Sequence, residues 1–220
     1  MPPISSMPSV SRAPALLALA ALLALTALPG CQGKTAEAEA QPAVGRTAAV
    51  KPKKAAGPVN DTGGFCEQTF AAGQKRFTWP PERPLPDGTT PAAPGADRWT
   101  WVNVWATWCA PCVEEMGLLG RWTRALQQEG RPIALELLTI DKPEDTDKLR
   151  DRMGKGLPGQ VRWLRDEPDF GPFLDSIGVD RSAAIPIHAL VDPHGDLRCV
   201  RVGAISGQDY AAIKSILAGG

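Results

Sequence analysis

Apolar and polar positions between residues 65 and 220 follow two alternating patterns. Continuous runs rich in β-branched and aromatic residues predict strands at residues 75–79, 99–105, 133–140, 161–164, 187–191 and 197–202. Apolar residues that recur every three or four positions predict helices at residues 109–129, 143–153, 168–177 and 206–217, the last capped by Ser206. This order predicts an α/β domain with a central mixed β-sheet flanked by helices.

The first 30 residues are expected to be a targeting segment rather than part of the fold. Arg12 precedes an Ala- and Leu-rich run at residues 13–28, which is shorter than the ~20 residues that a membrane-spanning helix needs. The stretch Leu28-Pro29-Gly30-Cys31 is similar to the cleavage site of bacterial lipoproteins, so we predict a lipoprotein signal peptide over residues 1–30 and a lipid anchor on Cys31. An ordinary secretory signal with an incidental cysteine is the alternative. Either signal places the chain outside the cytoplasm.

The next segment lacks the residues from which a core is built. Residues 32–64 contain no aromatic residue and no Leu, Ile or Met, so they cannot bury enough apolar surface to offset the conformational entropy lost on folding. We expect residues 31–64 to be the lipidated cysteine followed by a flexible tether, and residues 65–220 to be a single domain. The formal net charge is zero and no basic tract is interleaved with aromatic residues, which argues against nucleic acid as a partner.

The most informative motif is Trp105-Ala106-Thr107-Trp108-Cys109-Ala110-Pro111-Cys112, which lies where a predicted strand gives way to a predicted helix. Unpaired N–H groups and the positive partial charge of a helix N-terminus favour a thiolate over a thiol. The thiolate is the reactive form of cysteine, and the second cysteine, three residues on, can close a small disulfide ring. The motif predicts a redox-active dithiol that works without another cofactor.

This motif, together with Glu115, Ile185-Pro186 and the final hairpin and helix, is similar to the thioredoxin superfamily. The chain most resembles the membrane-anchored, extracytoplasmic thiol-disulfide oxidoreductases of the TlpA/ResA type. The resemblance implies a thioredoxin-like three-layer sandwich. It also implies that Cys109 is the exposed nucleophile and that Cys112 is the partly buried resolving thiol.

The resemblance further assigns the substrate contacts to Trp108, Ile185 and Pro186. Pro186 occupies the place of the family's cis-proline, which faces the dithiol, and the backbone of Ile185 would pair with an extended substrate segment. A trans proline that opens an edge strand is the alternative.

Two positions depart from the family pattern. Asn103 stands where thioredoxin-like proteins often hold a buried acid, and an amide cannot take a proton from Cys112. Glu115, three residues after Cys112, is the candidate base, with a solvated helix glutamate as the alternative. Gly117 replaces the proline that kinks the first helix in the family.

Two cysteines remain once Cys31 is lipidated and the motif cysteines form the active pair. We expect a structural disulfide between Cys66 and Cys199, because the compartment oxidises exposed thiols. A buried free Cys199 with an exposed Cys66 stays open as the alternative.

Other chemistries fit the sequence less well. A zinc site would need two further ligands, and the candidates Cys66, Cys199, His188 and His194 lack paired spacing, so we expect no metal. Val113 follows Cys112 where haem attachment needs a histidine. Copper chaperones of this fold space their cysteines more widely, and Ala106 and Val102 replace the threonine and proline of peroxiredoxins. We interpret His188 as a strand residue, His194 as a turn residue and residues 141–147 as solvated charges.

The sequence thus predicts an extracytoplasmic, lipid-anchored thiol-disulfide oxidoreductase. Resemblance suggests that it reduces disulfides of exported proteins, such as apocytochrome c or a copper-site assembly protein, and that a membrane electron donor re-reduces it. A disulfide oxidase and a non-catalytic thioredoxin-like docking module are the alternatives.

Overall fold

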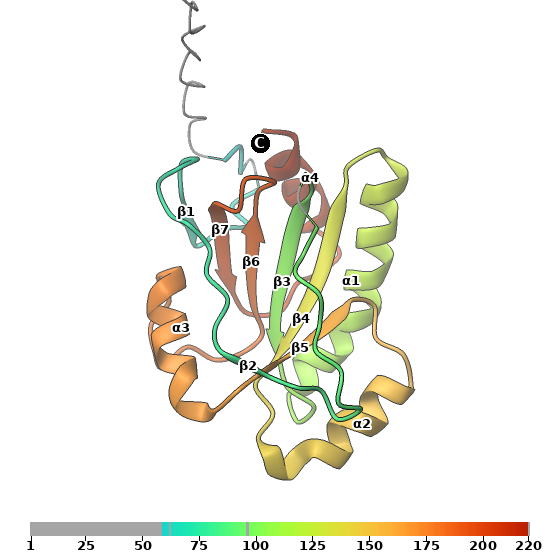
Figure 1. Cartoon of the computed structure of the whole chain (residues 1–220). Coiled ribbons are helices and arrows are strands. Elements are labelled where there is room, and N and C mark those ends of the chain that lie inside the picture. The colour runs from blue at the N-terminus through green and yellow to red at the C-terminus, as the bar shows by residue number, and fades with distance from the viewer. Residues whose placement is uncertain (1–58, 62, 96, 220) are drawn as a thin grey trace, which may run out of the picture. The chain divides into compact units, whose positions relative to one another are not determined.

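The computed structural model describes residues 59–61, 63–95 and 97–219 (Figure 1). The expected signal peptide, Cys31 and the tether as far as residue 58 lie outside the described residues. The strands are β1 (Gln68–Thr69), β2 (Glu82–Arg83), β3 (Trp99–Trp105), β4 (Ile133–Thr139), β5 (Gln160–Leu164), β6 (Ile187–Val191) and β7 (Leu197–Val202). The helices are α1 (Ala110–Gln128), α2 (Thr146–Gly154), α3 (Phe170–Ile177) and α4 (Tyr210–Ala218), and 3-10 turns at Pro143–Asp145 and Glu167–Asp169 precede α2 and α3.

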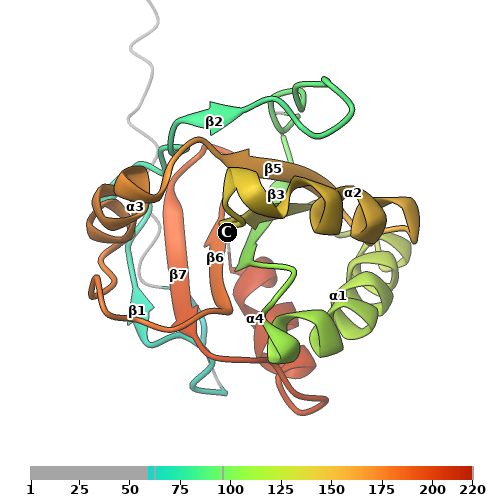
Figure 2. The same ribbon diagram turned by 90° about the horizontal axis from the view of Figure 1, so that it is seen from below.

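The described strands form one mixed sheet in the order β1-β7-β6-β3-β4-β5-β2. Strand β3 pairs in parallel with β4 and antiparallel with β6, and the β6–β7 hairpin is antiparallel. Helices α1 and α4 pack in one apolar cluster and α3 in the other, so helices cover both faces of the sheet (Figure 2). The three layers confirm the predicted α/β sandwich.

Strand β3 lies in the middle of the sheet, and all of its residues are buried. Side chains alternate across a strand, so Val102 and Val104 face the cluster that contains α3, while Trp101 and Trp105 face α1. Asn103 lies between these two tryptophans on the same face. A polar residue therefore stands at the centre of the face that α1 covers.

One predicted strand and the predicted start of one helix are wrong. Residues 75–79 form no strand beyond one bridge between Arg76 and Asp196. The apolar residues there, Phe77 and Trp79, pack against the cluster that contains α3, and Pro80 and Pro81 cannot donate to a continuing ladder. Helix α4 begins at Tyr210 rather than at residue 206.

The later start of α4 has a local cause. The N-cap residue is Asp209, and Ser206 donates its backbone N–H to the Asp209 carboxylate at 2.7 Å and its hydroxyl at 3.1 Å. Ser206 therefore closes a turn in front of the helix instead of capping it.

A segment before β3 is anchored to the sheet by Arg162. This side chain, 4% exposed, contacts the carboxylates of Glu136 at 2.7 Å and Glu82 at 3.1 Å and lies over the ring of Trp79. Burial raises the pKa of the Glu136 carboxyl above its ordinary value, although Arg162 opposes the shift. The contacts bring β2, with Arg83, to the edge of the sheet beside β5.

The N-terminal end of the domain is held by the predicted disulfide between Cys66 and Cys199, which the structure contains. Asp61 accepts hydrogen bonds from the backbone N–H groups of Phe65 and Cys66 at 2.9 and 2.8 Å. Strand β1 then pairs with β7, with Thr69 opposite Cys199. The disulfide joins this extension to a strand of the sheet across 133 residues of sequence.

We expect Cys66→Ala/Cys199→Ala to lower the free energy of unfolding by up to about 5 kcal/mol, because the bond restricts a long loop in the unfolded chain. Urea unfolding of the purified, non-reduced protein measures the change. The matched control is Cys109→Ala/Cys112→Ala, which opens a ring between cysteines only three residues apart and should cost much less. Equal losses in the two double variants would contradict the expectation.

Candidate active site around the Cys109–Cys112 disulfide

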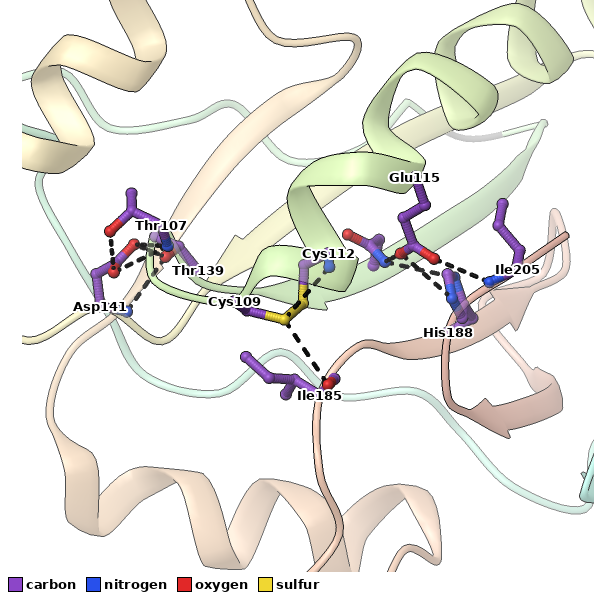
Figure 3. Close-up of a disulfide and its surroundings, with 10 residues drawn as sticks. Thr107, Cys109, Cys112, Glu115, Thr139, Asp141, Ile185, His188 and Ile205 are labelled. Carbon is purple, nitrogen blue, oxygen red and sulfur yellow. Dashed lines mark hydrogen bonds and ion pairs between the residues drawn. A yellow bond between two sulfur atoms is a disulfide. The ribbon is translucent and has the colours of Figure 1, made fainter.

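The two motif cysteines form a disulfide at the N-terminus of α1 (Figure 3). Cys109 is the N-cap residue, and its sulfur accepts a hydrogen bond from the backbone N–H of Cys112 at 3.3 Å. Pro111 lies in the first turn, where its missing N–H costs no helical hydrogen bond. On reduction, a Cys109 thiolate would lie against the orphan N–H groups of the helix end, which stabilise negative charge.

The accessibility of the two sulfurs differs less than expected. Cys112 is fully buried and Cys109 is 5% exposed, so the predicted exposed nucleophile lies at the margin of the surface in the disulfide form. The reason is that Cys109 packs between α1 and the loop before β6, where its sulfur is 3.7 Å from the carbonyl oxygen of Ile185. Its neighbour Trp108 is the exposed large hydrophobic side chain of the described residues, at 58%.

The Ile185–Pro186 peptide bond is cis, as the resemblance implies. Pro186 is buried, and its carbonyl oxygen accepts a hydrogen bond from the backbone N–H of Gly203 at 2.8 Å. This contact fixes the loop against the end of β7. Figure 3 shows that the carbonyl oxygen of Ile185 points toward the disulfide.

Glu115 is buried, at 4% exposure, and is not the solvated helix glutamate of the alternative. One carboxylate oxygen, Oε1, accepts a hydrogen bond from Asn103 Nδ2 at 2.8 Å. The other, Oε2, accepts one from the backbone N–H of Ile205 at 2.9 Å. The amide at position 103 thus serves as a donor that holds the carboxylate, which lies one helical turn beyond Cys112.

His188 belongs to the same cluster, although its sequence position gave no such indication. It is fully buried, and its Nε2 lies 3.5 Å from Glu115 Oε1. Its Nδ1 accepts a hydrogen bond from Trp101 Nε1 at 3.2 Å. The available signal was Asn103 within an apolar strand, because a buried amide needs polar partners and His188 stands opposite it in the β3–β6 register.

Asp141 was expected among solvated charges but is buried, at 3% exposure. Its carboxylate accepts hydrogen bonds from the Thr107 backbone N–H at 3.1 Å, the Thr107 hydroxyl at 2.7 Å and the Thr139 hydroxyl at 2.5 Å. These bonds fix the loop that enters the motif two residues before Cys109. Asp141 is therefore a positioning residue that the charge pattern alone could not identify.

A cavity of about 300 Å³ opens beside Trp108. Its apolar lining comes from Ile140, Leu164 and Phe170, and its charged rim includes Arg83 and Lys142. The cavity offers space for an apolar side chain of a bound polypeptide next to Trp108.

Within the described residues, no group of three His, Cys, Asp or Glu side chains is arranged to hold a metal ion. Among the four further zinc candidates, Cys66 and Cys199 are bonded to each other, and His188 lies against Glu115. The fourth, His194, is exposed in the turn between β6 and β7. In the described part of the chain, no helix has the length and apolar character needed to cross a membrane.

Comparison with known proteins finds similar sequences and similar solved structures, while no family model matches the chain. The thiol-disulfide oxidoreductase ResA of Geobacillus thermodenitrificans is 26% identical over 112 residues, which cover 50% of this chain and 57% of ResA. The match thus spans little more than half of that relative.

Among solved structures, a thioredoxin-related protein of Neisseria meningitidis serogroup B aligns over 60% of this chain and 92% of its own, with 18% identity and a TM-score of 0.47. The thioredoxin domain of a thiol-disulfide oxidoreductase from Bacteroides vulgatus aligns over 55% of this chain and 79% of its own, with 20% identity and a TM-score of 0.42.

We expect Glu115→Gln to alter the thiol titration curve of reduced Cys112, because an amide cannot accept its proton. The new amide also sets an N–H group against one of the donors that the carboxylate satisfied. Cysteine alkylation followed by mass spectrometry as a function of pH measures both thiols, and Cys109 should remain alkylatable.

The matched control for this prediction is Glu114→Gln, which removes the same charge from the neighbouring, exposed glutamate. It should leave both titration curves at their wild-type positions. If Glu115→Gln also left the Cys112 curve unchanged, Glu115 would have no part in the chemistry of the dithiol.

Proposed function

We propose that this chain, a thioredoxin-superfamily protein of the TlpA/ResA type, catalyses thiol-disulfide exchange through Cys109 and Cys112. The observation that carries the proposal is the Cys109–Cys112 disulfide at the N-terminus of α1 with a buried carboxylate one turn beyond it. The similarity to a named thiol-disulfide oxidoreductase supports the same activity.

In the reductive direction, the Cys109 thiolate attacks one sulfur of a substrate disulfide. The substrate S–S bond breaks, a mixed disulfide forms, and the first substrate sulfur leaves as a thiolate that takes a proton from solvent. Cys112 then gives its proton to Glu115 and attacks the Cys109 sulfur. The second substrate thiolate leaves, and the enzyme holds the Cys109–Cys112 disulfide, so two electrons have passed to the substrate.

The surroundings of the dithiol suit a polypeptide substrate. The Ile185 carbonyl lies beside the Cys109 sulfur, and the exposed ring of Trp108 borders an apolar cavity. An extended substrate segment would pair with the backbone at Ile185 and place a side chain next to Trp108. We propose disulfides of exported proteins as substrates, with oxidised apocytochrome c and copper-site assembly proteins as the first to test.

We further propose that the protein works outside the cytoplasm, anchored by a lipid on Cys31. The lipoprotein-like stretch that ends at Cys31 supports this location, and the Cys66–Cys199 disulfide suits an oxidising compartment. Each turnover leaves the enzyme oxidised, so a dithiol electron donor in the membrane would have to return it to the reduced state.

Insulin reduction by the purified protein tests the activity directly. We expect turnover by the wild type, none by Cys109→Ser, and a trapped mixed disulfide with Cys112→Ser, because only the first cysteine attacks substrate. Glu114→Gln serves as the control with an altered charge near the site. A wild type that reduces neither insulin nor a peptide disulfide would favour the non-catalytic docking module.

The reduction potential decides the direction. Titration of the dithiol against a glutathione or dithiothreitol buffer should give a value well below about −200 mV for a reductase. A value near about −120 mV would overturn the reductive proposal in favour of a disulfide oxidase.

A further inference from the structure

The buried polar cluster on the α1 side of the sheet contains a histidine that the exchange reaction described above does not use. His188 is fully buried on β6, beside Asn103 of β3 and facing Glu115 of α1. A histidine enclosed in this way must satisfy both ring nitrogens or lose the hydrogen bonds it made to water. Its hydrogen-bond partners therefore define its protonation state.

The groups around Nδ1 require this atom to be a hydrogen-bond acceptor. Trp101 Nε1 carries a hydrogen and can only donate, and it lies 3.2 Å from His188 Nδ1. The Asn103 amide nitrogen, also a donor, lies 3.4 Å from the same atom. A hydrogen on Nδ1 would point at two donors. The geometry therefore requires a lone pair on Nδ1 and places the ring hydrogen on Nε2.

Nε2 lies on the side of the ring nearest the carboxylate, but it is buried without a hydrogen-bond partner in this structure. Nε2 is 3.5 Å from Glu115 Oε1, the oxygen that accepts from Asn103. With Asn103 on Oε1 and the Ile205 N–H on Oε2, the carboxylate accepts hydrogen bonds from β3 and from the segment after β7. These hydrogen bonds fix the orientation of the carboxylate that is proposed to accept the proton of Cys112.

Other charged groups near this cluster come from β7 and α1. Arg201 of β7 is the register partner of His188, and its guanidinium lies over the Phe65 ring, whose centroid is 6.3 Å from that of His188. Arg201 has Asp209 as a counter-ion at 3.9 Å. On α1, the exposed side chains of Glu114 and Arg121 line a separate surface cavity with Glu115.

We propose that His188 is a positioning residue for the exchange reaction: it is locked by Trp101 as the neutral Nε2–H tautomer, and in the reduced enzyme its unpartnered Nε2–H closes the 3.5 Å gap to Glu115 and holds that carboxylate ready to receive the Cys112 proton. The proton stops at Glu115 and does not pass to the imidazole. This inference rests on the proposed function, because it concerns the proton that Cys112 releases during turnover.

Two amide variants separate the roles of the two ring nitrogens. His188→Gln places an amide N–H near the position of Nε2 and keeps the donor to Glu115. His188→Asn places an amide oxygen near the position of Nδ1 and keeps the acceptor for Trp101, but loses the donor. The pair removes the same aromatic ring and differs in which hydrogen bond survives.

The readout is the pH dependence of the resolving step, followed by rapid mixing of the reduced enzyme with a peptide disulfide. In His188→Asn the acid limb of the profile should move to higher pH, because the variant cannot supply the donor that the proposal assigns to the carboxylate. In His188→Gln it should stay near the wild-type position. KM should be unchanged in both, since neither variant alters Trp108 or Ile185. Indistinguishable profiles for the two variants would overturn the proposal.

A second measurement on the wild type needs neither activity nor a variant of His188. The chain contains two histidines, so ¹⁵N NMR of the imidazole nitrogens at pH 7 gives two sets of signals, and His194→Gln assigns them. We expect His188 as a single Nε2–H tautomer, and a mixture of tautomers when Trp101→Phe removes the lock. An Nδ1–H tautomer or an imidazolium in the wild type would overturn the proposal. An inactive wild type with the expected tautomer would instead count against the proposed function, and with it the role of His188 in turnover.

Discussion

A carboxylate enclosed by protein must be surrounded by hydrogen-bond donors, because water no longer solvates its charge. Glu115 is such a group, and it lies on the covered face of α1 one turn beyond Cys112. Its hydrogen-bond donors come from β3 and from the chain after β7, and His188 of β6 lies 3.5 Å from it. The antiparallel register of β3 with β6 and the return of the chain toward α1 must therefore hold together. The environment of the dithiol therefore depends on the strand order at the centre of the sheet.

The central elements could be predicted from the sequence because burial on both faces leaves a continuous apolar run. Strand β3 follows this rule along its whole length, and the hairpin strands β6 and β7 were expected at their observed bounds. The strands at the edges of the sheet form for a different reason. Strands β1 and β2 are two residues long and depend on contacts with distant parts of the chain, such as those of Arg162. No local pattern carries that information.

The residues of the candidate site also fall into those that the local sequence predicts and those that depend on distant contacts. Cys109 and Cys112 are three residues apart, and this spacing alone predicts their chemistry, whereas the roles of Asp141 and His188 depend on partners far along the chain. Asp141 is buried because the Thr107 and Thr139 groups reach it, and His188 because Trp101 and Glu115 enclose it. Their residue types alone are compatible with a solvated loop and an ordinary strand. Asn103 was the one local sign that polar groups meet beneath α1.

The Cys66–Cys199 bond also determines how the domain responds to force. Tension applied from the N-terminal side of Cys66 enters β7 through a covalent link before it reaches β1. Strand β7 is paired with β6 along its length as well as with β1, so the load spreads into the interior of the sheet. Without the bond, the same pull would peel a two-residue edge strand, one hydrogen bond after another. The disulfide therefore makes the domain more resistant to a pull on its N-terminal end.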